Sequence, residues 1–155
     1  MRVSSAIVFV IAAIFSSPSY AADYEGTAVV VDGDTIELRV GDKIIPVRLC
    51  GIDSPEARHA GGPEASAKMA ELITGKEVQC VQVGGGTPCD GRSKPTSYKR
   101  IVAQCFVDGE DISKKMVCSG HAVDWPKFSG KRYWLSIPTT TFFRKEGKSG
   151  LVSKK

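Results

Sequence analysis

Two acidic turns in the sequence carry residue types that metal and phosphate chemistry need. Asp34 lies in the turn formed by residues 32–35, and Asp53 follows a predicted strand, with Glu56 three residues later. If the strands between the two turns pair, Asp34 and Asp53 converge, and two carboxylates with a backbone carbonyl are the hard oxygen donors that calcium binds. Glu56 could then reach a metal-bound or nearby water. The alternative is that these residues are solvated turn acids without partners.

Two arginines are expected to lie near these acids. Arg48 precedes Asp53 by five residues, and Arg100 begins a predicted strand. Arginines beside a carboxylate and metal cluster indicate phosphate chemistry, because a planar guanidinium can hold two phosphate oxygens at once. For either arginine taken alone, an ion pair on a strand face is an equal alternative. The loop before Arg100 contains three further basic residues, Arg92, Lys94 and Lys99.

Short strands separated by turns must position these residues. Apolar and β-branched segments, several of them alternating with polar residues, predict five strands, over residues 25–31, 36–40, 45–49, 76–83 and 100–107. Pro63 begins a predicted helix over 63–73, and Asp111 caps a second one that ends at Cys118. The segments 51–62 and 84–97 are predicted as loops. We therefore expect an α+β protein, mainly β: a five-stranded OB-fold Greek-key barrel with two or three short helices.

The first 21 residues are typical of a secretory signal peptide. Arg2 precedes an apolar core over residues 6–15, and Ser19 and Ala21 fit the small positions before a cleavage site. The core is shorter than the roughly 20 residues that span a bilayer, although a retained anchor is the alternative. We expect cleavage to yield a secreted or periplasmic protein with one domain over 22–133 and no attachment to the membrane.

The composition is that of a globular protein. The chain has 155 residues, of which 42% are hydrophobic and 25% charged, and its net charge is +4. These values exclude a disordered or collagen-like chain. A mild excess of positive charge suits a polyanionic partner but is more often a solvated surface.

Cysteine usage predicts disulfides. In an exported chain cysteines pair more often than they bind metal, and neither His59 nor His121 lies near a cysteine in the sequence. An odd number leaves at least one thiol free or paired outside the chain, and we expect this to be Cys118, on a predicted helix face. Cys80 with Cys89 is the first hypothesis for a pair, and the other pairings stay open. The five cysteines are Cys50, Cys80, Cys89, Cys105 and Cys118.

Four segments together resemble the thermonuclease, or staphylococcal-nuclease-like, family. They match the family in order and spacing, and the resemblance extends over about residues 24–133. The segments are Val-Asp-Gly-Asp-Thr-Ile (31–36), Arg-Leu-Cys-Gly-Ile-Asp-Ser-Pro-Glu (48–56), Gly-Pro-Glu-Ala-Ser (62–66) and Tyr-Lys-Arg-Ile-Val-Ala (98–103).

The resemblance implies an OB-fold barrel and calcium-dependent hydrolysis of DNA and RNA at the 5′ P–O bond, which leaves 3′-phosphate ends. It implies that Glu56 activates the attacking water and that Arg48 and Arg100 bind the scissile phosphate. Tyr98 would contact the nucleotide, and Asp32 would support the metal ligands. Those ligands would be Asp34, Asp53 and the carbonyl of Ser54.

The chain departs from the family pattern in two places. Lys99 stands where the family commonly has Gly before the second arginine. After Tyr133, Pro138 and the threonines of 139–141 do not favour the charged final helix of the family. We expect residues 134–155 to form a poorly ordered tail.

A non-catalytic OB-fold module that binds single-stranded nucleic acid is the second hypothesis. Such modules combine a basic groove with aromatic platforms. A pure binder has no use for three carboxylates that face a phosphate, because they repel it unless a cation intervenes. We therefore expect a monomeric nuclease that acts on single-stranded DNA and RNA. The candidate aromatic platforms are Tyr98, Phe106, Trp125 and Phe128.

Overall fold

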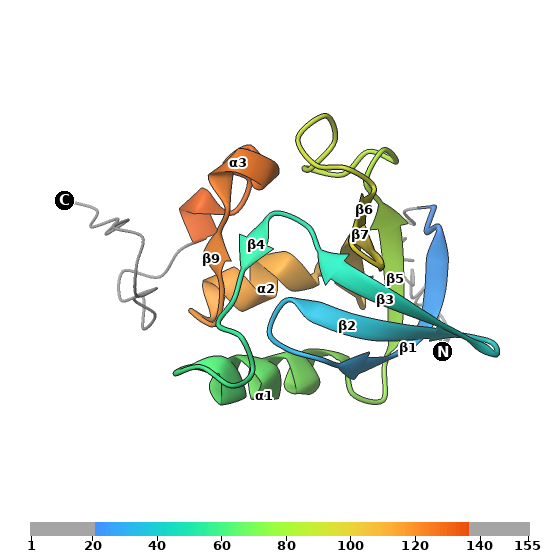
Figure 1. Ribbon diagram of the computed structural model, residues 1–155, viewed down its shortest axis with the longest axis horizontal. Coiled ribbons are helices and arrows are strands. Elements are labelled where there is room, and N and C mark those ends of the chain that lie inside the picture. The colour runs from blue at the N-terminus through green and yellow to red at the C-terminus, as the bar shows by residue number, and fades with distance from the viewer. Residues whose placement is uncertain (1–20, 137–155) are drawn as a thin grey trace, which may run out of the picture.

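The computed structural model describes residues 21–136, which form a closed barrel of five longer strands with three α-helices around it (Figure 1). The longer strands are β1 (Tyr24–Val30), β2 (Thr35–Val40), β3 (Lys43–Leu49), β5 (Glu77–Gln82) and β7 (Arg100–Val107). Two-residue strands are β4 (Ile52–Asp53), β6 (Thr96–Ser97), β8 (Glu110–Asp111) and β9 (Val123–Asp124). The helices are α1 (Gly62–Ile73), α2 (Ile112–Cys118) and α3 (Pro126–Ser129), followed by one 3₁₀ turn, η1 (Trp134–Ser136).

The barrel closes through a single parallel pairing. Strands β1, β2 and β3 form an antiparallel meander, and β1 and β7 both pair with β5 in the antiparallel sense. Strand β3 then runs parallel to β7, with Arg48 opposite Val102. This mixed five-stranded barrel confirms the predicted OB type.

Apolar side chains of the strands and of two helices fill the barrel. Ala65, Met69 and Ile73 recur every four residues on α1, so they lie on one face of the helix, and all three are buried. In Figure 1, α1 runs beneath β1 and β2. Burying a side chain of this size contributes about 1.5–3 kcal/mol, so α1 is held mainly by this face. The same cluster includes Ile36, Leu38, Val47, Leu49, Ile112, Met116 and Val117.

The helix signals in the sequence are confirmed. Pro63 lies in the first turn of α1, and the Asp111 carboxylate accepts a hydrogen bond from the backbone N–H of Lys114 at the start of α2. No helix within residues 21–136 is long and apolar enough to cross a membrane.

The predicted pairing of Cys80 with Cys89 is wrong. Cys80 forms a disulfide with Cys105, the residue directly opposite it on β7. Directly opposite residues of paired strands place their side chains on the same face, about 5 Å apart, which suits a disulfide. Cys118 is free and exposed, as expected.

The predicted loop 51–62 contains a short strand. Ile52 pairs with Asp124, and Asp53 with Val123, in a two-stranded sheet made by β4 and β9. Two-residue strands leave no periodic pattern in a sequence, which explains why this pairing was not predicted. The predicted signal peptide lies outside the described residues except for Ala21, and so does the predicted tail except for η1.

Candidate functional site

Most of the predicted site residues collect at one end of the barrel. Strand β2 begins at Thr35, directly opposite Arg48 near the end of β3. Strand β7 begins with Arg100 and runs parallel to β3, so its first residues lie beside the last residues of β3. The backbone N–H of Leu49 donates to the carbonyl of Asp34 (2.9 Å), which fixes the first acidic turn to the end of β3.

Asp34 joins the two acidic turns. Its Oδ2 accepts a hydrogen bond from the Ser54 backbone N–H (2.9 Å) and lies 2.9 Å from Nη2 of Arg48. Its side chain is almost fully buried. The convergence expected from strand pairing is therefore present, because the Asp34 carboxylate of the first acidic turn binds the backbone of Ser54, 20 positions later in the second turn.

Arg48 lies between the two predicted metal ligands. Its Nη2 is 2.9 Å from Asp34 and 3.9 Å from Oδ1 of Asp53. It also donates hydrogen bonds to the carbonyls of Leu49 (2.7 Å) and Ile52 (2.9 Å). Three acceptors within hydrogen-bond distance, together with the more distant Asp53 carboxylate, thus fix the position of this guanidinium.

The electrostatics of Asp34 favour positive charge at this place. Burial raises the pKa of the Asp34 carboxyl to about 7, and Arg48 only partly offsets this effect. The neighbouring Asp32 and Asp53 contribute to the same rise. A second cation near Asp34 would stabilise its charged form.

Asp32 and Gly33 shape the turn that presents Asp34. Oδ1 of Asp32 accepts the Asp34 backbone N–H (2.9 Å), an Asx turn that fixes the loop. Gly33 lies so close to the Ser54 side chain that any Cβ at this position would overlap the Ser54 hydroxyl. The two acidic turns can meet because residue 33 is glycine.

Thr35 connects Arg100 to this cluster, a role that the sequence analysis missed. Nη1 of Arg100 donates to Oγ1 of Thr35 (3.1 Å), and this hydroxyl donates to Oδ1 of Asp34 (3.2 Å). Thr35 is buried. The available signal was its place directly after Asp34 and opposite Arg48.

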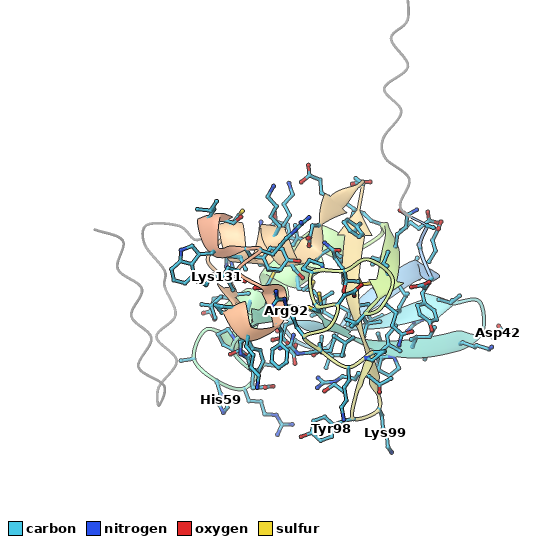
Figure 2. The ribbon with its side chains drawn as sticks, turned by 90° about the horizontal axis from the view of Figure 1, so that it is seen from above. Asp42, His59, Arg92, Tyr98, Lys99 and Lys131 are labelled. Atoms are coloured by element: carbon cyan, nitrogen blue, oxygen red, sulfur yellow. A yellow bond between two sulfur atoms is a disulfide. The ribbon has the colours of Figure 1, made fainter. Side chains whose placement is uncertain are left out.

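Glu56 and Tyr98 lie outside the contacts that connect Asp34, Arg48 and Arg100. The side chain of Glu56 is exposed, and its backbone carbonyl accepts the His59 N–H (2.9 Å) in the loop before α1. Tyr98 is 97% exposed, in the turn between β6 and β7. Figure 2 shows Tyr98 pointing away from the barrel into solvent.

The donor set fits a hard divalent cation. The carboxylates of Asp34 and Asp53 approach the same guanidinium nitrogen, and the Ser54 backbone lies against Asp34. Oxygen donors of this kind bind calcium or magnesium rather than softer metals. Within residues 21–136, however, no three His, Cys, Asp or Glu side chains form a ready metal cluster. What the described residues show is therefore a set of hard oxygen donors around the buried Asp34.

The aromatic residues of the binding-module hypothesis differ in their exposure to solvent. Phe106 is buried and cannot stack on a base. Trp125 is 39% exposed and packs edge to face against Phe128, with ring centroids 4.7 Å apart. Tyr98 is the aromatic side chain of this set that is freely available as a platform.

Comparison with known proteins places the chain in one family. Residues 46–134, more than half of the chain, match the family described as Staphylococcal nuclease homologue. An uncharacterized endonuclease of Escherichia coli is 34% identical over 111 residues, which cover 70% of this chain and 66% of that protein. Micrococcal nuclease of Shigella flexneri is 38% identical over 78 residues, or 50% of this chain and 44% of that protein.

The family match covers most of the predicted site residues. The matched region does not extend over the full length of the relatives. The chain spans less than two thirds of both of these relatives. The family match includes Arg48, Asp53, Glu56 and Arg100, and Asp34 precedes it. With its barrel closed by β3 and β7 and with two arginines held at the acidic turns, the chain belongs to the staphylococcal nuclease homologue family.

Proposed function

We propose that this protein is a calcium-dependent nuclease that hydrolyses phosphodiester bonds of single-stranded DNA and RNA and leaves 3′-phosphate ends. One observation carries the proposal. A buried carboxylate, Asp34, contacts Arg48 directly and reaches Arg100 through one hydroxyl, that of Thr35. Two guanidiniums and two carboxylates at one barrel end suit a phosphate with a cation, because each charge then has an opposite partner.

Each of the predicted site residues would have a separate role in the reaction. Arg48 and Arg100 would bind the non-bridging oxygens of the scissile phosphate, where negative charge grows in the transition state. Glu56 would take a proton from the attacking water. The water oxygen would bond to phosphorus as the 5′ P–O bond breaks, and the 5′ oxygen would leave with a proton taken from solvent water.

Asp34, Asp53 and the Ser54 carbonyl would hold the cation, with Asp32 fixing the turn. Calcium, when bound, would neutralise charge on the phosphate and polarise its oxygens. Tyr98 would contact the nucleotide, because its exposed ring lies two residues before Arg100 on the same turn.

The binding-module hypothesis is weaker on electrostatic grounds. Asp32, Asp34 and Asp53 would repel a bound strand unless a cation offsets them. The relatives named above carry the names endonuclease and micrococcal nuclease, which also favours an enzyme.

A cleavage assay on the purified chain tests the proposal. We expect single-stranded DNA to be cut in calcium, no cutting in excess chelator, and product ends that accept label only after phosphatase removes a 3′-phosphate. Binding without cutting in calcium would favour the module instead. Full activity in magnesium alone would contradict the calcium site.

We further propose that the protein acts as a monomer in the periplasm or outside the cell, because residues 1–21 have the features of a signal peptide. N-terminal sequencing of the secreted or periplasmic protein tests this: we expect the mature chain to begin near Ala22.

A further inference from the structure

A second apolar cluster lies outside the barrel. On β7, Ala103 and Cys105 belong to the barrel core, whereas Val102 belongs to this second cluster. Side chains of a strand alternate between its faces, so Val102 points away from the Cys80–Cys105 disulfide. The cluster consists of Cys50, Val83, Cys89 and Val102, with Phe128 packed against it.

Two thiols meet in this second cluster. Cys50 is 1% exposed and Cys89 0%, both are free thiols, and they pack in the same four-residue cluster. The hydrogen bond with Cys89 and the burial raise the pKa of the Cys50 thiol, so it is protonated in the folded chain. These two neighbouring thiols have no role in the proposed hydrolysis.

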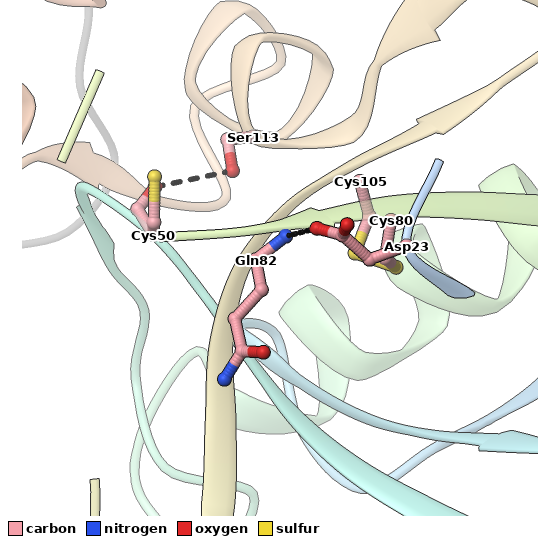
Figure 3. Close-up of a disulfide and its surroundings, with 6 residues drawn as sticks. All are labelled: Asp23, Cys50, Cys80, Gln82, Cys105 and Ser113. Carbon is pink, nitrogen blue, oxygen red and sulfur yellow. Dashed lines mark hydrogen bonds between the residues drawn. A yellow bond between two sulfur atoms is a disulfide. The ribbon is translucent and has the colours of Figure 1, made fainter. Parts of the chain in front are cut away.

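The backbone on the Cys50 side is fixed. The Cys50 N–H donates to the Ala103 carbonyl (2.9 Å), and the Ser113 hydroxyl donates to the Cys50 carbonyl (3.4 Å; Figure 3). Cys50 directly follows Leu49, whose carbonyl accepts a hydrogen bond from Arg48. The cysteine therefore belongs to the turn that positions the catalytic arginine.

The backbone on the Cys89 side is fixed as well. The Asp90 carboxylate accepts hydrogen bonds from the Gly84 N–H (2.7 Å), the Gly86 N–H (2.8 Å) and the Thr87 hydroxyl (2.6 Å). The Cys89 carbonyl accepts two further backbone N–H groups. These bonds organise the loop after β5 so that it presents Cys89 to the second cluster.

We propose that Cys50 and Cys89 form a second disulfide, which ties the loop between β5 and β6 to the turn that carries the acceptors of Arg48. Two S–H bonds break and one S–S bond forms. The two electrons and two protons pass to an oxidising disulfide such as oxidised glutathione, which becomes two thiols. Because both sulfurs are buried, the exchange takes place during folding or when the loop opens.

Thiol counting on the full chain tests the proposal. Protein refolded in a mixture of reduced and oxidised glutathione is denatured and alkylated without reductant, and the mass increase gives the number of free thiols, with a glutathione adduct counted as one free thiol. With both disulfides formed, we expect one free thiol, that of Cys118. A count of three or more overturns the proposal.

Two matched variants make the count decisive. Cys118→Ser removes the exposed thiol, so the count should fall to zero if Cys50 and Cys89 are bonded and to two if they are free. Cys89→Ser should raise the wild-type count by one, because it releases Cys50, whereas it lowers the count if the pair is not bonded. If Cys89→Ser does not fold, Cys118→Ser alone decides the question.

A tryptic map without reductant, with fragmentation of the linked species between Cys80 and Cys89, identifies the partners. Cys80 and Cys89 lie in one predicted tryptic peptide, residues 77–92, while Cys50 lies in 49–58 and Cys105 in 101–114. Two disulfides therefore join three peptides into one species, which reductant separates. The proposal is overturned if peptide 77–92 is joined to peptide 101–114 alone and peptide 49–58 is recovered in alkylated form. The outcome does not depend on nuclease activity.

Discussion

Asp34 is the residue whose burial determines the charge balance of the site. Its side chain contacts Arg48, Thr35 and the Ser54 backbone, and it has little contact with solvent. A buried carboxylate needs such partners, because desolvation favours its neutral form. Glu56, by contrast, is exposed on a loop and keeps the access to water that a general base requires.

The exposed position of Glu56 leads to a kinetic prediction. Glu56→Gln removes the proton acceptor but keeps nearly the same shape, so nucleotide binding should persist while kcat falls by about 10²–10⁴-fold. Single-turnover cleavage rates and binding of a non-cleavable oligonucleotide measure the two effects. An unchanged rate in a folded variant would remove Glu56 from the mechanism.

The two arginines should respond to substitution differently from surface lysines. Arg48→Lys loses the guanidinium geometry that reaches three acceptors at once, and Arg100→Lys loses the hydrogen bond to Thr35. We expect kcat/KM to fall by at least about 10²-fold in each, a loss of some 3 kcal/mol of transition-state stabilisation. Lys94→Ala, in the loop before β6, is the control and should be mild. Equal, small losses in all three variants would indicate a general basic patch.

The charged residues of the site could be predicted from the sequence. The hydrogen bonds that connect Arg100 to Asp34 could not. Carboxylates and arginines in the turns between strands stand out by type and spacing. Thr35 does not, because a threonine at the start of a strand is ordinary. Its role appears only when the hydroxyl is seen between Arg100 and Asp34.

At the scale of elements, Asp111 connects α2, β7 and the end of the described chain. Its carboxylate accepts hydrogen bonds from the Lys114 N–H, from the Gln104 amide (2.7 Å) and from the buried Tyr133 hydroxyl (3.0 Å). One side chain thus serves as a helix cap and as the partner of two buried groups.

Removal of this carboxylate should be costly. Asp111→Ala loses the cap of α2 and leaves the Tyr133 hydroxyl without an acceptor, so we expect a loss of roughly 2–4 kcal/mol in the free energy of unfolding. Urea denaturation measures it. Glu110→Ala, the adjacent exposed residue that pairs with Lys115, should cost less than about 1 kcal/mol. Similar losses in both variants would show that the three hydrogen bonds of Asp111 contribute little.

The elements that sequence alone predicted have strong local signals. Pro63 and the repeat of Ala65, Met69 and Ile73 define α1 without tertiary information. The Cys80–Cys105 disulfide depends instead on which residue of β7 faces Cys80, and that register is a property of the closed barrel. The short pairing of β4 with β9 likewise exists only because α2 returns the chain to the second acidic turn.

For the whole molecule, closure of the barrel is what brings the site together. Arg48 and Arg100 lie on strands far apart in the sequence, and the parallel pairing of β3 with β7 places them at the same end. Periodicity could predict each strand but not this pairing, for which the family resemblance was needed.

We expect the Cys80–Cys105 disulfide to contribute more to the stability of the barrel than the residues after Tyr133. Tyr133 is buried in the core, whereas Leu135 is 84% exposed, so packing within the described part of the chain weakens after Tyr133. Deletion of residues 136–155 should therefore change Tm by no more than about 2 °C. Reduction, which breaks the link between β5 and β7, should lower Tm by on the order of 10 °C, because a disulfide typically contributes about 2–4 kcal/mol. Differential scanning calorimetry of the full chain, the truncated chain and the reduced full chain separates the two effects. A truncated protein that melts as early as the reduced one would show that residues 136–155 stabilise the barrel.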